Sequence, residues 1–226
     1  MAVPKRITVR DLARCKTENR RFAMLTAYDF PTARLLDEAG IPVLLVGDSL
    51  GQVVLGYDTT LPVTMDEMLH HCRAVARGAR NALLIGDMPF GSYQACVEDG
   101  IRNATRFLKE GGMHGVKIEG PNLELTQALE LEKAGAFSLV LEAVPAAVAT
   151  TVTRALAIPT IGIGAGAGCD AQVLVVHDLL GMGASHEAGP KFVKRYANLG
   201  DAIVEAAAAY RRDVEAGTYP DEAHSY

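Results

Sequence analysis

The sequence has 226 residues, of which 49% are hydrophobic and 22% are charged, and its net charge is −5. This composition excludes a disordered chain, and no apolar run reaches the roughly 18 residues that a membrane-spanning helix needs. The acidic charge, without a basic cluster, argues against nucleic acid as a partner. The scattered single cysteines, and the absence of an apolar segment behind the first basic residues, predict a cytoplasmic protein. The charge and the apolar pattern predict that it binds neither nucleic acid nor membrane.

Seven short apolar runs recur along the chain, each separated from the next by 9 to 35 residues. They cover residues 22–27, 43–46, 82–85, 115–118, 138–141, 160–163 and 173–176. The runs are continuous rather than alternating, which is typical of strands buried on both faces of a parallel sheet. Stretches with helical spacing stand between them or follow the last one, and they cover residues 32–39, 64–76, 97–108, 123–134, 144–156 and 201–216.

This alternation of strand and helix signals predicts an α/β fold. No linker, low-complexity tract or charge run divides the chain, so residues 1–226 are expected to form a single domain. An open doubly wound sheet and a closed (βα)8 barrel both fit the pattern. Seven strands are one fewer than a closed barrel needs.

Carboxylates stand at the ends of four successive predicted strands. They are Asp48, Asp87, Glu119 and Glu142. The carboxyl ends of parallel strands lie at one edge of the sheet, so these acids are expected to converge on one mouth. Converging carboxylates need a cation or a shared proton, and oxygen ligands favour a hard cation such as Mg²⁺. The alternative for each acid is that it caps the next helix. Asp29, near the end of the first predicted strand, is expected to be a cap or turn residue.

Two more polar residues stand beside these acids. Lys117 lies two residues before Glu119, and the two-residue period of a strand places both side chains on one face. Lys117 therefore pairs either with the acids in a structural ion pair or with the carboxylate of a substrate. Ser49 follows Asp48 and either donates to a bound oxygen or caps a helix.

The glycine-rich stretch 162–168 formally contains the spacing of a dinucleotide-binding loop. The match is weak, because no clear helix opens there and no acid follows about 20 residues later. The stretch is interpreted either as a strand-end loop whose backbone approaches a ligand or as a tight turn needed for packing. Among the histidines, His177 is the candidate for a pocket residue, because it is predicted to end the last strand.

Several motifs together resemble those of the ketopantoate hydroxymethyltransferase family. The motifs cover residues 26–29, 45–51, 61–64, 86–90, 116–120, 141–145 and 158–166, with the C-terminal residues 217–226. The resemblance runs over nearly the whole chain. It implies a (βα)8 barrel of the phosphoenolpyruvate/pyruvate type that assembles as a homodecamer. It also implies transfer of a hydroxymethyl group from 5,10-methylenetetrahydrofolate to 3-methyl-2-oxobutanoate, which gives 2-dehydropantoate on the route to pantothenate and coenzyme A.

The resemblance also implies roles for individual residues. Mg²⁺ is expected around Asp48 and Asp87, with Glu119 completing the metal site. The carboxylate and keto oxygen of the substrate are expected to meet positions that include Asp48, Ser49, Asp87 and Lys117. Glu142 matches the family's proton acceptor, which removes the C3 proton of the 2-oxo acid.

One departure from the family pattern stands after Gly120. The family carries a whole βα unit between the motif at residues 116–120 and the helix that ends near Ala134, and this chain has only that helix there. Either an internal piece of the family's chain is missing from this sequence, or the barrel is open at its fifth position. The first alternative, a missing piece, is favoured because the motifs on both sides of the break are intact. An open barrel would expose two strand edges, which is a liability in solution.

Three other hypotheses stand beside this one. The chain could be a metal-dependent aldolase or lyase of the same superfamily that acts on another 2-oxo acid. It could be a non-catalytic paralogue that only oligomerises. Nicotinamide binding by the glycine-rich stretch is the fourth, and calorimetry with NAD would test it.

Overall fold

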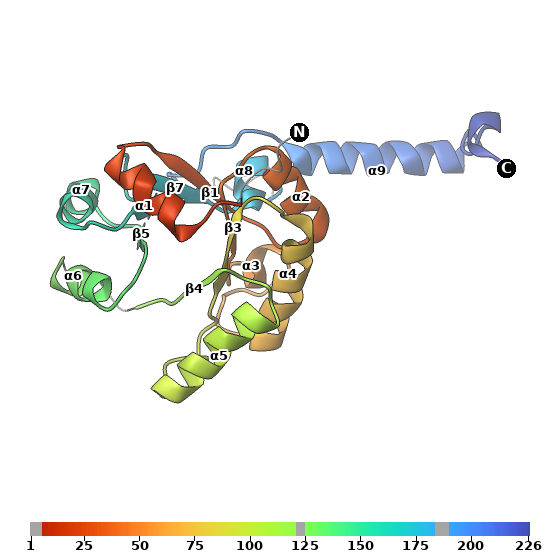
Figure 1. Cartoon of the computed structure of the whole chain (residues 1–226). Helices are drawn as coiled ribbons and strands as arrows, with labels where there is room; N and C mark the ends of the chain where they lie inside the picture. Colours follow the sequence, from red (N-terminus) through yellow and green to blue (C-terminus); the bar gives the residue numbers. More distant parts are fainter. Residues whose placement is uncertain (1–5, 121–124, 184–189) are drawn as a thin grey trace. The chain divides into compact units, whose positions relative to one another are not determined.

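The computed structural model describes residues 6–120, 125–183 and 190–226, and these form two compact units, Met1–Val175 and Val176–Tyr226. The first unit contains a sheet of seven parallel strands among its described residues (Figure 1). The strands are β1 (Phe22–Thr26), β2 (Val43–Val46), β3 (Leu83–Asp87), β4 (Gly115–Lys117), β5 (Leu139–Glu142), β6 (Thr160–Ile163) and β7 (Ala171–Leu174). The α/β fold predicted from the sequence is therefore confirmed, and so are all seven strands.

The helices of the first unit alternate with these strands. They are α1 (Val9–Thr17), α2 (Phe30–Glu38), α3 (Leu50–Val53), α4 (Met65–Gly78), α5 (Val97–Lys109), α6 (Leu125–Lys133) and α7 (Ala146–Ala155). Helix α4 packs on β2 and β3, and α5 packs beside α4 and on β4. The predicted helices are confirmed, except that the expected start of α6 at Leu123 lies outside the described residues. Helices α1 and α3 were not predicted from the sequence.

Two helix starts in this unit follow the local sequence closely. At α4 the backbone N–H of Thr64 donates to Glu67 Oε2 over 2.7 Å, and the N–H of Glu67 donates to Thr64 Oγ1 over 3.2 Å. This reciprocal pair satisfies two backbone donors at the end of the helix. At α2 the side chain of Asp29 accepts from the N–H of Thr32 over 2.7 Å. The expectation that Asp29 serves as a helix cap is thus confirmed.

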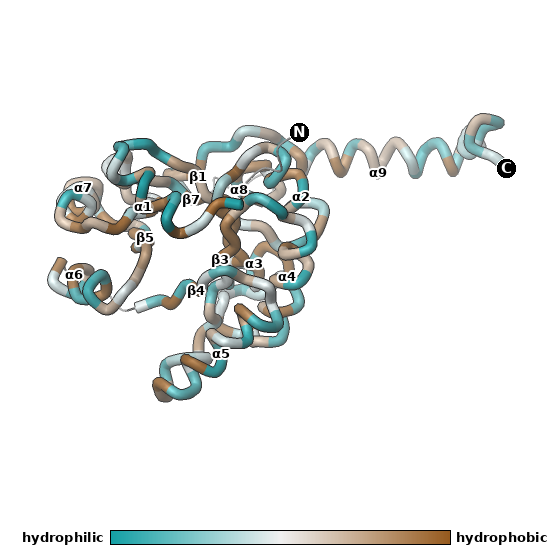
Figure 2. The backbone as a smooth tube through the Cα atoms, in the orientation of Figure 1, coloured by the Kyte–Doolittle hydropathy of each residue, from teal (hydrophilic) through white to brown (hydrophobic). Residues whose placement is uncertain are grey.

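The inner face of the sheet carries one continuous hydrophobic core. It contains buried side chains from β1, β2, β3, β6 and β7, which are Met24, Val43, Leu45, Leu83, Ile85, Ile161, Ala171 and Val173, together with Leu12 of α1. Strands β3 and β6 lie four positions apart in the sheet, yet both contribute to this cluster. The sheet must therefore curl so that its inner face encloses the core, as in a barrel. Figure 2 shows the central strands as the most hydrophobic part of the unit.

The strand order is β4-β3-β2-β1-β7-β6-β5. Every neighbouring pair is parallel. The first strand in the chain, β1, pairs with β2 on one side and with the last strand, β7, on the other. This is the order of a (βα)8 barrel in which one position, between β4 and β5, holds no described strand. The vacant position coincides with the fifth βα unit that the sequence lacks after Gly120.

The second unit contains α8 (Val176–Leu180), α9 (Leu199–Glu215) and a short 3-10 helix, Glu222–His224. The prediction that His177 ends the last strand is wrong, because His177 lies on α8. The pairing of β7 with β1 ends at Leu174, and Val176 already begins the helix. A role for His177 in a pocket stays a prediction. None of the described helices combines the length and the apolar character needed to cross a membrane.

Candidate metal and substrate site

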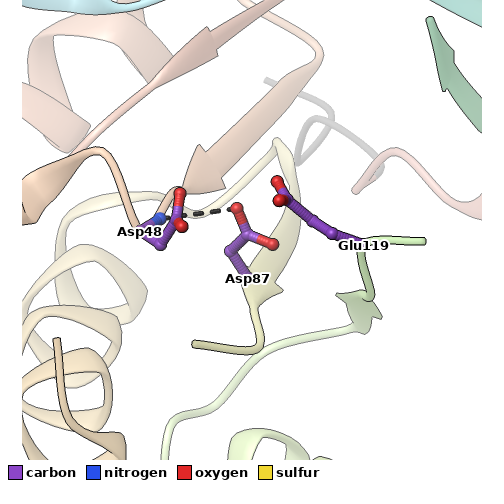
Figure 3. Close-up of side chains that lie close together, drawn as sticks. All are labelled: Asp48, Asp87 and Glu119. Carbon is purple, nitrogen blue, oxygen red and sulfur yellow. Dashed lines mark hydrogen bonds between the residues drawn. The ribbon is translucent and has the colours of Figure 1, made fainter. Parts of the chain in front are cut away.

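Three carboxylates meet at the C-terminal ends of β2, β3 and β4. Asp48, Asp87 and Glu119 each offer one oxygen atom, and these atoms all lie within 4.8 Å of one another. Figure 3 shows the three side chains pointing toward one another from three successive strand ends. The backbone N–H of Asp48 also faces Asp87 Oδ2 at 3.4 Å. The convergence of these three acids is as the sequence predicts.

The strands explain why these residues meet. Leu83 and Ile85 point into the inner core, so the two-residue period of β3 directs Asp87 to the same face. Gly47 lies between β2 and Asp48, and a Cβ atom at this position would stand 2.9 Å from Ser49 Oγ. A larger residue at position 47 would therefore push Ser49 out of place.

Lys117 forms ion pairs with two of the three acids. Its Nζ lies 2.7 Å from Asp87 Oδ2, and it also donates to Glu119 Oε1. The side chain of Lys117 is only 16% exposed. Burial disfavours the charged ammonium, but the carboxylates of Asp87 and Glu119 outweigh this effect and raise the pKa of Lys117 above its ordinary value. Lys117 is therefore charged at neutral pH and neutralises part of the acidic cluster.

Asp87 is the most enclosed member of the group. It is 1% exposed, and burial raises the pKa of its carboxyl group to about 7, against the opposing effect of Lys117 and with a further upward contribution from Asp48. Its Oδ2 accepts a hydrogen bond from Nζ of Lys117, whereas its Oδ1 is buried without a hydrogen-bond partner among the described residues. A buried carboxylate oxygen without a donor is costly unless a cation or a proton satisfies it.

These donors fit a hard divalent cation. All three side chains offer oxygen, and Mg²⁺ is bound in proteins through one or two carboxylates together with water and substrate oxygens. The orphaned Oδ1 of Asp87 is the observation that favours an ion here over a purely structural ion-pair network. Asp48 is half-buried and Glu119 is exposed, so the site opens on one side.

Ser49 occupies the N-cap position of α3, but its side chain makes no capping hydrogen bond there. Its hydroxyl instead shares a 2.9 Å hydrogen bond with the hydroxyl of Tyr28, which is 2% exposed. The Nδ1–H of His71 donates to the backbone carbonyl of Tyr28 over 2.7 Å and so fixes that segment. Ser49 is therefore held at the rim of the acidic cluster by a buried partner.

Tyr93 is a residue of the site that the sequence did not indicate. Its hydroxyl donates to the backbone carbonyl of Glu119 over 3.0 Å and accepts from the backbone N–H of the same residue, also at 3.0 Å. Burial raises the pKa of this phenol. Tyr93 thereby anchors the segment just beyond β4, where Glu119 leaves the sheet. It follows no strand directly and belongs to no motif, so no sequence signal marked it.

Glu142 lies at the end of β5 and is exposed. Val140 packs on the inner core, so Glu142 lies on that same inner face, at the same end of the sheet as Asp87. It is not one of the three clustered acids. The next residue, Ala143, has φ +53, a conformation that costs a non-glycine residue about 1 kcal/mol or more. The backbone is thus strained directly beside the predicted proton acceptor.

The glycine-rich stretch 162–168 packs closely against α7. A Cβ atom on Gly166 would approach Ala146, and one on Gly168 would overlap Thr150, while Gly164 and Gly166 have positive φ values. These contacts support the alternative that the glycines serve a tight turn and close packing. Approach of the backbone to a ligand stays a prediction.

The family model of ketopantoate hydroxymethyltransferase matches this chain in two segments, residues 6–127 and 122–222. The relative from Syntrophus aciditrophicus (strain SB), named 3-methyl-2-oxobutanoate hydroxymethyltransferase, is 48% identical over 266 aligned positions, which cover 98% of this chain and 97% of that protein. A relative of the same name from Rhodococcus jostii (strain RHA1) is 46% identical over 268 positions, covering 99% and 92%.

These alignments also locate the departure from the family. The two matched segments of the family model meet at residues 122–127. The alignment with the Syntrophus aciditrophicus relative has 266 positions, whereas 98% of 226 residues is about 221, so about 45 positions face no residue of this chain. The break in the family model falls between β4 and β5, the position at which the described residues form no strand.

Solved structures share the fold at low sequence identity. A 2,3-dimethylmalate lyase of the PEP mutase/isocitrate lyase superfamily has a TM-score of 0.61 at 15% identity, covering 97% of this chain and 92% of that one. A phosphonopyruvate hydrolase has a TM-score of 0.58 at 12% identity, covering 96% and 93%. These likenesses support the barrel type inferred from the sheet. The match to the family model and the relatives aligned over nearly their full length show that the chain belongs to the ketopantoate hydroxymethyltransferase family.

Proposed function

We propose that this chain is a transferase that moves a hydroxymethyl group from 5,10-methylenetetrahydrofolate to 3-methyl-2-oxobutanoate and forms 2-dehydropantoate, in pantothenate biosynthesis. The family membership supports this activity. The structural observation that carries it is the group of Asp48, Asp87 and Glu119 with Lys117 among them, at the C-terminal mouth of a curled parallel sheet. This is where barrels of this kind hold their active sites.

Mg²⁺ would be held by Asp48 and Asp87, with Glu119 completing the site. When bound, the ion supplies stabilisation for negative charge that develops on the 2-keto oxygen of the substrate. The buried, unpartnered Oδ1 of Asp87 supports its role as a ligand. Lys117 holds Asp87 and Glu119 in place through its ion pairs and keeps the cluster from becoming a bare concentration of negative charge.

The 2-oxo acid is an anion, and the site offers a charged ammonium and a hydroxyl to receive it. Lys117 is charged and only 16% exposed, so its attraction for a carboxylate is weakly screened by water. Ser49, held by Tyr28, is positioned to donate to a substrate oxygen. Together with Asp48 and Asp87 these residues form the proposed substrate site.

Glu142 is the proposed proton acceptor for C3 of the substrate. Its place on the inner face, at the same sheet end as the acidic cluster, supports this role. Glu142 takes the C3 proton, and the electron pair left at C3 forms the new bond to the one-carbon unit of the folate. The two bonds of that carbon to N5 and N10 of the folate break, and water supplies the oxygen of the hydroxymethyl group. Tetrahydrofolate leaves with the C3 proton and one proton of the water on its two nitrogens.

The same family suggests a cytoplasmic enzyme that folds as one barrel domain over residues 1–226 and assembles as a homodecamer. These statements extend the proposal from the site to the whole protein. Sedimentation of the purified chain would measure the assembly directly.

The substrate proposal can be tested with a panel of 2-oxo acids in deuterated water containing Mg²⁺. We expect C3 deuterium incorporation, followed by NMR, to be fastest with 3-methyl-2-oxobutanoate. Faster exchange with another 2-oxo acid would favour the alternative, an aldolase or lyase of the same superfamily. Binding of the 2-oxo acid and Mg²⁺ with no exchange of any substrate would favour a non-catalytic paralogue.

A further inference from the structure

The sides of helix α5 differ in what they contact. Phe107 is fully buried and packs against Gly86 of β3, which defines the inward side. At about 100° per residue, Arg106 lies about 100° to one side of Phe107. There its guanidinium contacts Asp66 of α4 at 2.8 Å. The side of α5 that faces α4 is therefore known.

The opposite lateral side of α5 is apolar and uncovered. Val97, Ile101, Ala104 and Leu108 lie about 60° to 120° from Phe107 in the other direction. Val97 is 72% exposed, Ile101 63% and Leu108 48%. In Figure 2 α5 accordingly carries hydrophobic segments between hydrophilic ones. In a barrel, the next helix around the sheet covers this lateral side.

The sheet is unfinished at the same place. Strand β4 pairs with β3 and β5 pairs with β6, and these are the two edges of the sheet among the described residues. An uncovered edge presents unpaired N–H and C=O groups that can template another strand. Ile118, just beyond β4, is also 58% exposed. The apolar side of α5 and the two strand edges flank one vacant position.

The size of that position can be estimated from the chain's relatives. A strand parallel to both β4 and β5 needs a crossover on each side, usually a helix. Helix α6 already supplies the crossover into β5. What remains is one helix and one strand with their loops, which suits the approximately 45 aligned positions of the Syntrophus aciditrophicus relative that face no residue here.

We propose that the apolar side of α5, together with the edges of β4 and β5, is a docking surface for a separate helix–strand segment of about 45 residues. The segment's helix packs its apolar face on Val97, Ile101 and Leu108, and its strand pairs in parallel with β4 on one side and β5 on the other. The partner is therefore a polypeptide with an amphipathic helix followed by a β-strand, which completes the barrel from outside the chain.

The test uses the full 226-residue chain and a synthetic peptide. The peptide is the internal segment of the Syntrophus aciditrophicus relative that aligns opposite the break. Titration calorimetry should give binding with one peptide per chain. Hydrogen exchange should show new protection in β4 and β5 when the peptide is present. Both measurements are made without substrate, so their failure is distinguishable from failure of the proposed transferase activity.

Two matched variants distinguish binding at this surface from non-specific hydrophobic binding. Ile101→Asp should weaken peptide binding by about tenfold or more, because it places a charge in an apolar contact. Leu35→Asp on α2, where Leu35 is 57% exposed, should bind as the unchanged chain does. Circular dichroism should show both variants folded. Absence of binding would overturn the proposal, and so would self-association of the chain through Ile101 without peptide binding, because a second copy would then be the occupant.

Discussion

Asp87 combines three properties that together point to a bound cation. It is buried, it pairs with Lys117, and it has one oxygen without a donor among the described residues. A structural ion pair satisfies neither the burial cost nor the second oxygen completely. A bound divalent cation would offset the cost of burying the charge and would also give the second oxygen a partner. We therefore expect a change at Asp87 to have the largest effect on metal binding.

Asp87→Asn should keep the fold and weaken Mg²⁺ binding by about tenfold or more, since a neutral amide is a poorer ligand for a hard cation. Calorimetric titration with Mg²⁺ measures this. Asp58→Asn, at an exposed aspartate outside the acidic cluster, is the matched control and should bind Mg²⁺ normally. Equal affinities for the two variants would show that the strand-end acids are not ligands.

The pH dependence of stability gives a second test of Asp87. Its pKa is raised to about 7 from 3.8, so the folded state holds this proton more tightly than the unfolded chain does. The stabilising contribution is therefore complete below about pH 4 and is lost as the pH rises through about 7. In EDTA, the Tm of Asp87→Asn relative to the unchanged chain should increase between pH 5 and pH 8. A constant difference would contradict the raised pKa.

Glu142→Gln tests the proton acceptor separately from the metal. The variant should retain binding of the 2-oxo acid and Mg²⁺, because Glu142 is not part of the acidic cluster. Its C3 exchange in deuterated water should fall by about 10²- to 10⁴-fold, the usual effect of removing a positioned base. Exchange near the unchanged rate would assign the proton to another group.

The meeting of Asp48, Asp87 and Glu119 could be predicted because each acid stands at or just beyond the end of an apolar run, and Lys117 lies within the run before Glu119. A strand's two-residue period and the shared edge of parallel strands were enough to place Lys117 with Glu119, and Asp48 with Asp87. Tyr93 could not be predicted, because it reaches Glu119 from a loop 26 residues earlier. Only the fold brings that hydroxyl to the backbone beyond β4.

Among the elements, the strands followed the sequence most closely, because their apolar runs are buried on both faces. Helix α3 has only four residues, and the hydroxyl of its N-cap residue, Ser49, hydrogen-bonds to Tyr28 instead of capping the helix. No sequence pattern therefore predicted α3. The last strand illustrates a different limit. Residues 173–176 are uniformly apolar, and only the end of pairing with β1 shows that the strand stops at Leu174.

The edge strands carry a prediction of their own. Strands β4 and β5 each pair on one side within the described sheet, whereas β2 pairs on both. Amides of β4 and β5 should therefore exchange with deuterium faster than those of β2, because local opening at an edge breaks fewer contacts. Exchange followed by mass spectrometry compares the three strands in one experiment. Equal protection would mean that something covers the open position in solution.

At the scale of the whole molecule, the vacant position should separate two steps of the reaction. Lys117 and Glu119 stand beside the missing unit, so the site is open to water on that side, as the exposure of Glu119 indicates. Water in the site screens charge and can return a proton to C3 before the folate-derived carbon is attacked. The chain should therefore exchange the C3 proton yet make little 2-dehydropantoate. A chain with the family's unit inserted after Gly120 should couple exchange to product, and equal product yields from both chains would show that the unit is dispensable.

Asp48, Asp87 and Glu119 are proposed to form the metal site of a C3 proton transfer on 3-methyl-2-oxobutanoate. The most direct measurement is deuterium incorporation at C3 by the 226-residue chain, with Mg²⁺ and with EDTA, beside the Asp87→Asn variant. Exchange that requires Mg²⁺ and falls sharply in the variant is the predicted result. Exchange that persists in EDTA, or that is the same in the variant, would contradict the assignment of these acids as the metal site of the reaction.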